Sequence, residues 1–202
     1  MKIIQKGAEA TIYLDKGKII KLRERKLYRI PEIDLEKTKY PTRREAKILG
    51  DAKRFGVNVP LVLNLDESKS LIEIQYLSGN TLKDSYDKIK NRKQVLKEFG
   101  RQISILHEHD IIHGDLTTSN VILFKDKVFL IDFGLSFYST KIEDRAVDMH
   151  LLYQALEAKH YGSFKEDFDY VIEGYKIYKN SKMVLDRLRV VEQRGRYKKK
   201  NF

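Results

Sequence analysis

The sequence of 202 residues contains no cysteine. This absence excludes disulfide bonds and thiolate metal sites, and it is typical of proteins in a reducing compartment. The sequence also lacks any apolar run near the roughly 20 residues that a membrane-spanning helix needs, and it does not open with a secretory signal. We therefore expect a cytoplasmic protein with no membrane contact. Hydrophobic residues make up 42% of the chain, which excludes wholesale disorder and allows a sizeable core.

Acidic residues are too few to balance the basic ones, and the net charge is +11 at pH 7. Such an excess predicts an acidic partner, with nucleic acid the leading candidate and solubility alone the other interpretation. The last nine residues, RGRYKKKNF, carry five positive side chains, two aromatic rings and no acid. A segment of this kind cannot pack into a core, so we expect residues 194–202 to form a flexible basic tail. Cations among aromatic rings suit RNA, and the candidate RNA contacts are Arg194, Arg196, Lys198, Lys199 and Lys200.

The most informative segment covers residues 113–134 and reads HGDLTTSNVILFKDKVFLIDFG. Asp115 stands five positions before Asn120, and two β-rich runs then lead to Asp132 and Gly134. This is the spacing of a kinase catalytic loop followed by a metal-binding turn, joined by a hairpin. Phosphoryl transfer needs a carboxylate at the attacking oxygen, and an amide and a second carboxylate that hold magnesium against the nucleotide phosphates. We assign these roles to Asp115, Asn120 and Asp132 in that order, and we expect Gly134 to allow a sharp backbone turn.

Five short β-rich runs precede this segment. They predict an antiparallel sheet with strands near residues 2–4, 11–14, 18–22, 60–65 and 71–77. Lys21 lies one residue from the end of the third strand, where a kinase places the lysine that pairs with the α- and β-phosphates. The candidate phosphate-covering turn is Gly7, Ala8, Glu9 and Ala10, which has one glycine where a kinase glycine-rich loop has three.

Glu45 has two interpretations. Thr42 and Glu45 have the spacing of a capping box, which predicts a helix over residues 42–55 that ends at Gly56. Glu45 either closes this cap or pairs with Lys21 and orients it. The two roles compete for one side chain, and the sequence leaves both open.

The remaining chain is mostly helical by its hydrophobic periodicity. Helices are predicted over 81–90, 93–109, 142–160, 164–178 and 181–193, and residues 78–80 would form a hinge. The sequence therefore predicts an α+β, bilobal protein-kinase-like fold. Its N-lobe, residues 1–77, would be a five-stranded antiparallel sheet with one helix, and its C-lobe, residues 78–193, would be helical and reduced, with the site between the lobes.

A long activation segment is missing. Only about eight residues separate Gly134 from the next predicted helix, and no Ala-Pro-Glu triplet follows. Thr117 also stands where many protein kinases carry a phosphate-contacting lysine. We therefore expect ATP and Mg²⁺ to bind while the platform for a substrate peptide is poorly built. ATP hydrolysis, autophosphorylation or action on a docked partner are favoured over general protein kinase activity.

The sequence resembles the archaeal p53-related protein kinase family, the small atypical kinase of the KEOPS (EKC) complex. The matching pieces are KGAEA at 6–10, IIKL at 19–22, HGDLTTSN at 113–120, DFGLS at 132–136 and the basic ending. The resemblance implies an atypical serine/threonine kinase that acts largely as an ATPase and supports threonylcarbamoyl-adenosine modification of tRNA. It implies the tRNA-modifying subunit as a partner on the C-lobe, a small regulatory subunit on the N-lobe, and tRNA at the basic tail.

The resemblance also implies a role for each matched residue. Lys21 would orient the nucleotide phosphates with Glu45 as its partner, and Asp115 would be the catalytic base or position a water. Asn120 and Asp132 would hold magnesium, and Asp148 would anchor the catalytic loop. Two alternatives stay open: a RIO-like serine/threonine kinase in ribosome assembly, and a nucleotide-binding scaffold without useful turnover.

Overall fold

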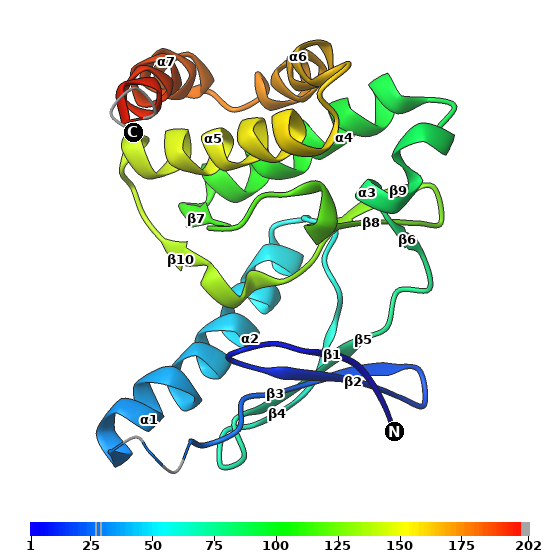
Figure 1. Ribbon diagram of the computed structural model, residues 1–202, viewed down its shortest axis with the longest axis vertical. Coiled ribbons are helices and arrows are strands. Elements are labelled where there is room, and N and C mark those ends of the chain that lie inside the picture. Colours follow the sequence, from blue (N-terminus) through cyan, green and yellow to red (C-terminus); the bar gives the residue numbers. More distant parts are fainter. Residues whose placement is uncertain (27, 29, 199–202) are drawn as a thin grey trace.

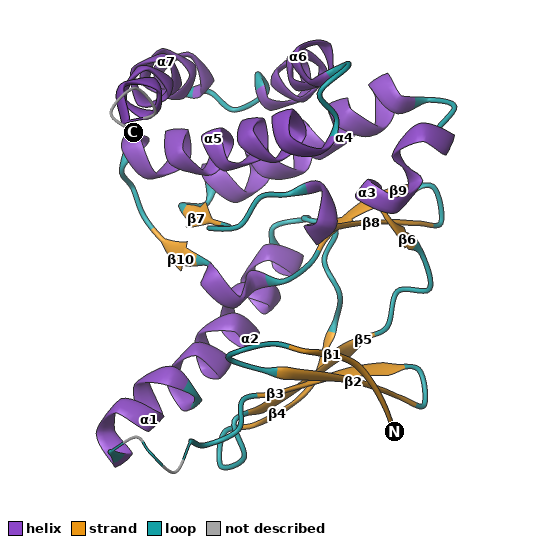
Figure 2. Ribbon diagram, in the orientation of Figure 1, coloured by secondary structure: helices purple, strands orange, loops and turns teal. Residues whose placement is uncertain are grey.

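The computed structural model describes residues 1–26, 28 and 30–198, with the side chains of residues 194–198 left out of the description. Figure 1 shows two lobes, with the sheet and helices α1 and α2 in one and the remaining helices in the other. Strands concentrate in the N-lobe and helices in the C-lobe (Figure 2). Within the described residues no helix is both long and apolar enough to cross a membrane.

The N-lobe sheet has the five antiparallel strands that the sequence predicts. They are β1 (Lys2–Lys6), β2 (Thr11–Asp15), β3 (Lys18–Leu22), β4 (Val62–Asp66) and β5 (Leu71–Gln75), in the order β1-β2-β3-β5-β4. The turn between β2 and β3 holds Lys16 and Gly17 at φ of 46° and 77°. Two left-handed residues in a two-residue turn give the twist that a tight hairpin requires. The register pairs Lys21 with Ile12 on one side and Ile72 on the other, so Lys21 is fixed in a central strand.

The helical part of the N-lobe differs from the prediction. It has two helices, α1 (Pro31–Lys37) and α2 (Lys39–Arg54), where one was expected over 42–55. The expected cap is wrong because Thr42 lies inside α2, where its hydroxyl donates to the Thr38 carbonyl (2.8 Å). Pro41 lies in the first turn of α2, where the missing N–H has no partner within the helix to lose.

The C-lobe is built around α4 (Arg92–Glu108). Around it are α3 (Leu82–Ser85), the 3₁₀ turn η1 (Tyr86–Lys88), α5 (Ile142–Lys159), α6 (Phe164–Tyr175) and α7 (Ser181–Lys198). Helices α4 and α6 touch backbone to backbone at two glycines. A Cβ atom on Gly100 would lie 1.9 Å from the Val171 carbonyl oxygen, and one on Gly174 would lie 1.8 Å from the Lys97 carbonyl oxygen. Only glycine permits this approach, which closes the C-lobe core.

Two small sheets carry the loops of the site. One joins β6 (Asn80–Thr81), β8 (Val121–Phe124) and β9 (Lys127–Leu130), and the other pairs β7 (Ile111–Ile112) with β10 (Phe137–Tyr138). The predicted hairpin between the two motif loops is β8–β9. Its turn residues Lys125 and Asp126 have φ of 50° and 57°, the values of a two-residue hairpin turn.

The C-terminal segment also differs from the prediction. Helix α7 continues to Lys198, so the described part of the predicted tail, residues 194–198, is helical in its backbone. Arg and Lys favour helices, and cations are stabilised near a helix C-terminus, so a basic composition does not end a helix by itself. The candidate RNA contacts Arg194, Arg196 and Lys198 lie on this last stretch, and Lys199 and Lys200 lie outside the described residues.

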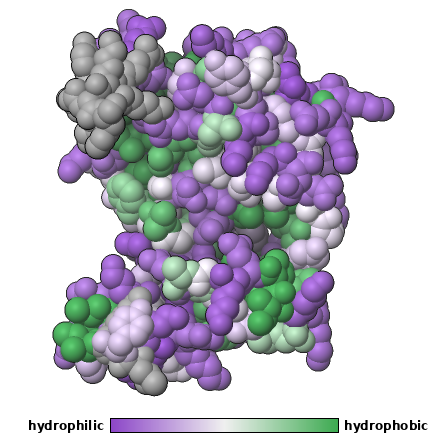
Figure 3. All heavy atoms as spheres, viewed as in Figure 1, coloured by the Kyte–Doolittle hydropathy of each residue, from purple (hydrophilic) through white to green (hydrophobic). Residues whose placement is uncertain are grey.

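The buried apolar side chains of the two lobes form one continuous core. In contrast, on the surface of α1 and the residue before it, Ile30, Ile33 and Leu35 are 60%, 45% and 43% exposed. Figure 3 shows green apolar atoms at the lower left of the N-lobe, at the position of α1 in Figure 1. This patch is an N-lobe surface that a protein partner can cover.

Candidate nucleotide and metal site

Lys21 joins the two lobes through its ammonium group. Its Nζ lies 3.0 Å from Glu45 Oε1 on α2 and 2.7 Å from Asp132 Oδ1 in the turn after β9. Lys21 and Glu45 are buried, whereas the Asp132 side chain is 44% exposed. The pairing of Lys21 with Glu45 settles the competition between the two roles of Glu45, because the carboxylate faces β3 and takes no part in a cap.

These contacts shift both pKa values in the direction of the charged forms. Burial acts to lower the pKa of Lys21, but Glu45 and Asp132 outweigh it and hold that pKa above its ordinary value. Burial likewise acts to raise the pKa of Asp132, and the Lys21 ammonium outweighs it and holds that pKa below its ordinary value. The site therefore keeps a cation and a carboxylate in contact at neutral pH.

Arg23 is a member of this cluster that the sequence reasoning missed. Its Nη2 lies 2.6 Å from Glu45 Oε2, and its Nη1 donates to Thr42 Oγ1 (3.1 Å). The side chains of Arg23 and Glu45 are each only 3% exposed. The sequence did contain an indication of this role. Side chains two residues apart on an extended segment point to the same side, so Arg23 points toward α2 as Lys21 does. Glu45 is thus held by one cation at each oxygen.

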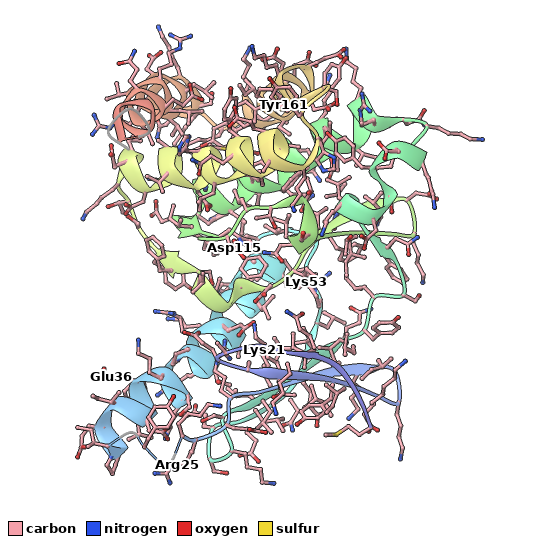
Figure 4. All side chains as sticks on the ribbon, in the orientation of Figure 1. Lys21, Arg25, Glu36, Lys53, Asp115 and Tyr161 are labelled. Carbon is pink, nitrogen blue, oxygen red and sulfur yellow. The ribbon has the colours of Figure 1, made fainter. Side chains whose placement is uncertain are left out.

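Asp115 and Asn120 are brought together at the start of the C-lobe. The Asn120 Nδ2 donates to the Asp115 carbonyl (2.9 Å) and to Asp115 Oδ2 (2.8 Å). Both amide hydrogens are used in these bonds, which leaves Asn120 Oδ1 and Asp115 Oδ1 as the oxygens able to take a ligand. The backbone N–H of Ile131 donates to the Asn120 carbonyl (3.0 Å), which ties this loop to the turn at Asp132. Figure 4 shows Lys21 and Asp115 on opposite sides of the junction between the lobes.

Asp148 on α5 fixes the catalytic loop, as expected from its position in the sequence. Its Oδ2 accepts from the His113 N–H (2.9 Å) and its Oδ1 from the Gly114 N–H (2.8 Å). Gly114 has φ of +80°, and a Cβ atom there would lie 2.6 Å from the Leu135 carbonyl oxygen. The ring of His113 accepts from the Asp115 N–H at Nδ1 (3.2 Å) and donates from Nε2 to the Ile131 carbonyl (3.0 Å). His113 therefore supports the loop through hydrogen bonds at both ring nitrogens.

The turn at Asp132 is built differently from the expectation. The left-handed residue is Asp132 itself, with φ of 60° and ψ of 68°, and Gly134 has no positive φ. Gly134 is needed for space instead, because a Cβ atom there would lie 3.2 Å from both Lys21 Nζ and Asp132 Oδ1. A side chain at this position would crowd the ion pair.

The segment after this turn is short, as predicted, and it is held in place. Phe137 and Tyr138 of β10 pair with Ile112 and Ile111 of β7. The Tyr138 hydroxyl donates to Asp51 Oδ2 on α2. The segment thus forms a strap between the C-lobe and α2.

The turn between β1 and β2 places Gly7, Ala8, Glu9 and Ala10 at the edge of the N-lobe. The Gly7 N–H donates to the Ala10 carbonyl (2.9 Å), and the first three of these residues are exposed. No contact joins this turn to the Lys21 cluster among the interactions described. Its role in covering phosphates remains a prediction.

Together, a twisted sheet with a Lys–Glu pair, and two loops with the spacing of a kinase catalytic loop and of its metal-binding turn, define a protein of the protein-kinase-like class. Solved structures support the fold. WaaP in complex with acyl carrier protein aligns with a TM-score of 0.66 at 14% identity, over 98% of this chain and 88% of that one. The bifunctional kinase-methyltransferase WbdD aligns with a TM-score of 0.51 at 21% identity, over 65% of this chain and 30% of that one.

Sequence comparison then identifies the family. The RIO domain family model matches residues 12–149. The KEOPS complex subunit Bud32 of Pyrococcus abyssi is 44% identical over 100% of this chain and 99% of its own length. A probable serine/threonine-protein kinase BUD32 homolog of Archaeoglobus fulgidus is 37% identical over 95% of this chain and 94% of its own length. The chain belongs to the Bud32 family of kinase-like proteins, which confirms the resemblance stated above.

A longer relative adds one observation. A probable bifunctional tRNA threonylcarbamoyladenosine biosynthesis protein of Methanococcus vannielii is 41% identical over 96% of this chain but only 36% of that protein. The present chain therefore corresponds to one part of that larger protein.

Proposed function

We propose that this protein binds Mg-ATP, turns it over as an atypical kinase and ATPase, and acts as a KEOPS subunit that supports threonylcarbamoyladenosine modification of tRNA. The observation that carries the catalytic part is the placement of Lys21 between Glu45 and Asp132, beside the Asp115–Asn120 pair. The names of the Pyrococcus abyssi and Methanococcus vannielii relatives support the part about tRNA modification.

The residues present fit a magnesium ion. Both amide hydrogens of Asn120 are donated to Asp115, so Asn120 Oδ1 is available as a metal ligand. The exposed carboxylate of Asp132 can supply a second oxygen ligand. An all-oxygen set with few protein ligands suits Mg²⁺, which keeps waters and takes further ligands from substrate phosphates. Magnesium held there would neutralise negative charge on the nucleotide phosphates.

The chain's own residues then have defined tasks. Lys21, held by Glu45, binds and orients the nucleotide phosphates, with the turn Gly7–Ala10 above them. Asp115 uses its free Oδ1 to accept a proton from an attacking hydroxyl or to orient a water, while Asn120 fixes its other oxygen. The strap formed by β10 leaves little support for a free peptide, and this favours water or a docked partner as the acceptor.

Partners follow from the relatives and from the surface. We propose the tRNA-modifying subunit as the C-lobe partner and a small regulatory subunit as the N-lobe partner, with the exposed apolar residues of α1 as a suitable contact. Residues Arg194, Arg196, Lys198, Lys199 and Lys200 remain candidates for tRNA contact on composition alone. A RIO-like kinase in ribosome assembly is a second candidate, favoured by the RIO domain match.

The test is magnesium-dependent ATP hydrolysis by the wild type, Asp132→Ala and the control Asp169→Ala, with and without tRNA and the modifying subunit. Asp169 is an exposed carboxylate on α6, away from the site. We expect partner-stimulated turnover that Asp132→Ala loses and Asp169→Ala keeps. Turnover only onto an unrelated protein, with no response to tRNA or partner, would move the assignment to the RIO-like kinase. Support of tRNA modification by Asp115→Ala would identify a scaffold without useful turnover.

A further inference from the structure

A groove of about 1440 Å³ lies on the C-lobe between the N-terminal half of α4, the β8–β9 hairpin and the end of α6. None of its lining residues belongs to the Lys21–Asp132 cluster or to the catalytic loop. In Figure 1 the hairpin lies on the opposite side of the C-lobe from the C-terminal helix α7. The groove is therefore separate both from the nucleotide site and from helix α7. The surface at the upper right of the C-lobe, over the start of α4, is mainly hydrophilic in Figure 3.

The charge of this groove is strongly positive. Seven Lys and Arg side chains line it, against three carboxylates. Three of the cations are already in ion pairs: Arg92 with Asp167 (3.0 Å), Lys97 with Glu173 (3.0 Å) and Arg101 with Glu98 (2.7 Å). The ion pairs occupy two of the three lining carboxylates, Glu98 and Glu173, whereas the third, Asp126, lies between Lys125 and Lys127 in the sequence.

Four exposed lysines remain, two on each side. Lys90 and Lys93 lie at the start of α4, and Lys125 and Lys127 lie at the tip of the β8–β9 hairpin. None of the four has a carboxylate within ion-pair distance among the described residues. Lys93 and Lys125 lie over aromatic rings, 4.9 Å from the centre of Tyr170 and 5.2 Å from the centre of Phe124.

The composition distinguishes the kind of partner. Protein interfaces are depleted in lysine and have an apolar centre, whereas nucleic-acid interfaces are more polar and much more positively charged. Among the large apolar side chains that line this groove, all of them within the described part of the chain, only Ile177 is strongly exposed, at 69%. A lysine is a flexible point charge, which suits a phosphate backbone that presents one charge after another.

We propose that this groove binds the sugar-phosphate backbone of RNA, with Lys90 and Lys93 on one wall and Lys125 and Lys127 on the other. This inference rests on the proposed function, since a subunit that supports tRNA modification works next to tRNA. It adds a contact surface to the chain that is independent of residues 194–202.

The experiment measures tRNA binding by the full chain across a salt series, by fluorescence anisotropy. Two double variants, Lys90→Gln/Lys93→Gln and Lys125→Gln/Lys127→Gln, each remove two charges from one wall. The matched control, Lys37→Gln/Lys53→Gln, removes two charges from exposed positions on α1 and α2. Each groove variant should flatten the slope of log K against log salt by about 1.5, and should bind about tenfold more weakly at 0.2 M salt. The control, and Lys125→Arg/Lys127→Arg, should bind like the wild type.

Two results would overturn the inference. Groove variants that bind tRNA as the control does would show that RNA does not use this surface, and polyglutamate that competes as well as RNA would assign the groove to an acidic polypeptide. Neither result would contradict the catalytic proposal, which is tested separately by the loss of ATP turnover in Asp132→Ala. Conversely, ATP turnover that is retained in Asp132→Ala would refute the catalytic proposal without contradicting RNA binding by the groove.

Discussion

Replacement of Arg23 by methionine tests whether the buried cluster around Glu45 holds the nucleotide lysine in place. Methionine keeps much of the side-chain volume and removes the charge and both hydrogen bonds. In the wild type Glu45 is bound at one oxygen by Lys21 (3.0 Å) and at the other by Arg23 (2.6 Å). After the substitution Glu45 remains buried with only Lys21, which it shares with Asp132 (2.7 Å).

The magnitude follows from burial. Removal of one partner from a buried pair costs about 3–5 kcal/mol of unfolding free energy, because the other charge stays buried and unpaired. Two features place this variant at the low end. Glu45 keeps Lys21 as a partner, and the Nε of Arg23 is itself a buried donor with no hydrogen-bond partner among the described residues, so its removal relieves a cost. We expect a loss of about 3 kcal/mol, which for a domain of this size lowers Tm by about 6–12 °C.

The assay is urea unfolding of Arg23→Met beside the control Arg54→Met. Arg54 also has a carboxylate partner, Asp51 at 2.7 Å, but its side chain is 70% exposed, so its loss should cost less than about 1 kcal/mol. Arg23→Lys keeps the positive charge but cannot donate to Glu45 and Thr42 with the fixed geometry of a guanidinium. Its free energy of unfolding should lie between those of the wild type and Arg23→Met. The reasoning fails if Arg23→Met is no less stable than Arg54→Met, because the guanidinium would then add nothing to the cluster.

Three further predictions concern the scaffold. Gly174→Ala should lower the free energy of unfolding by about 3 kcal/mol in urea, because its Cβ atom would lie 1.8 Å from the Lys97 carbonyl oxygen. A decrease under about 1 kcal/mol would show that α4 and α6 can move apart at little energetic cost. Gly114→Ala should lower ATP turnover far more than it lowers Tm, because the Cβ meets the Leu135 carbonyl oxygen at 2.6 Å in the catalytic loop, and unchanged turnover would contradict this. Burial lowers the pKa of His107 below its ordinary value of 6.5 despite Asp148. Below pH 6.5 the His107 side chain is therefore protonated in the unfolded chain but not in the folded chain, so the free energy of unfolding should decrease as the pH falls below 6.5. The decrease should be smaller in His107→Gln. Equal pH dependence of stability in the two proteins would exclude His107 as a cause.

The parts of the site that lie within one stretch of chain could be predicted from the sequence. The spacing of Asp115, Asn120 and Asp132 predicts both loops and the hairpin between them, because local hydrogen bonds and strand pairing decide that arrangement. In the five-stranded sheet the β1–β2, β2–β3 and β4–β5 pairs follow for the same reason, whereas β3 pairs with the distant strand β5. The capping box at Thr42 was wrong because the same residue spacing also occurs inside a helix, and α2 begins before it, at Lys39.

The parts that depend on contacts between distant segments could not be predicted in this way. Glu45 carried two interpretations until the structure showed Arg23 and Lys21 at its two oxygens. Gly134 was interpreted as a backbone hinge, but its lack of a side chain serves the ion pair of Lys21 with Asp132, 111 residues apart in sequence. A sequence pattern shows which residue types are available, whereas the distance between them is fixed only by the tertiary fold.

The position of α2 in this chain is fixed by contacts that need no long activation segment. Near the middle of α2, Arg23 and Lys21 hold Glu45 from the sheet. Farther along the helix, the Tyr138 hydroxyl donates to Asp51, so the two-residue strand β10 ties α2 to the C-lobe. Both contacts are made within the folded chain itself, without an added phosphate. The arrangement of Lys21 and Glu45 is therefore built into the fold, and we expect it to be present before any partner binds.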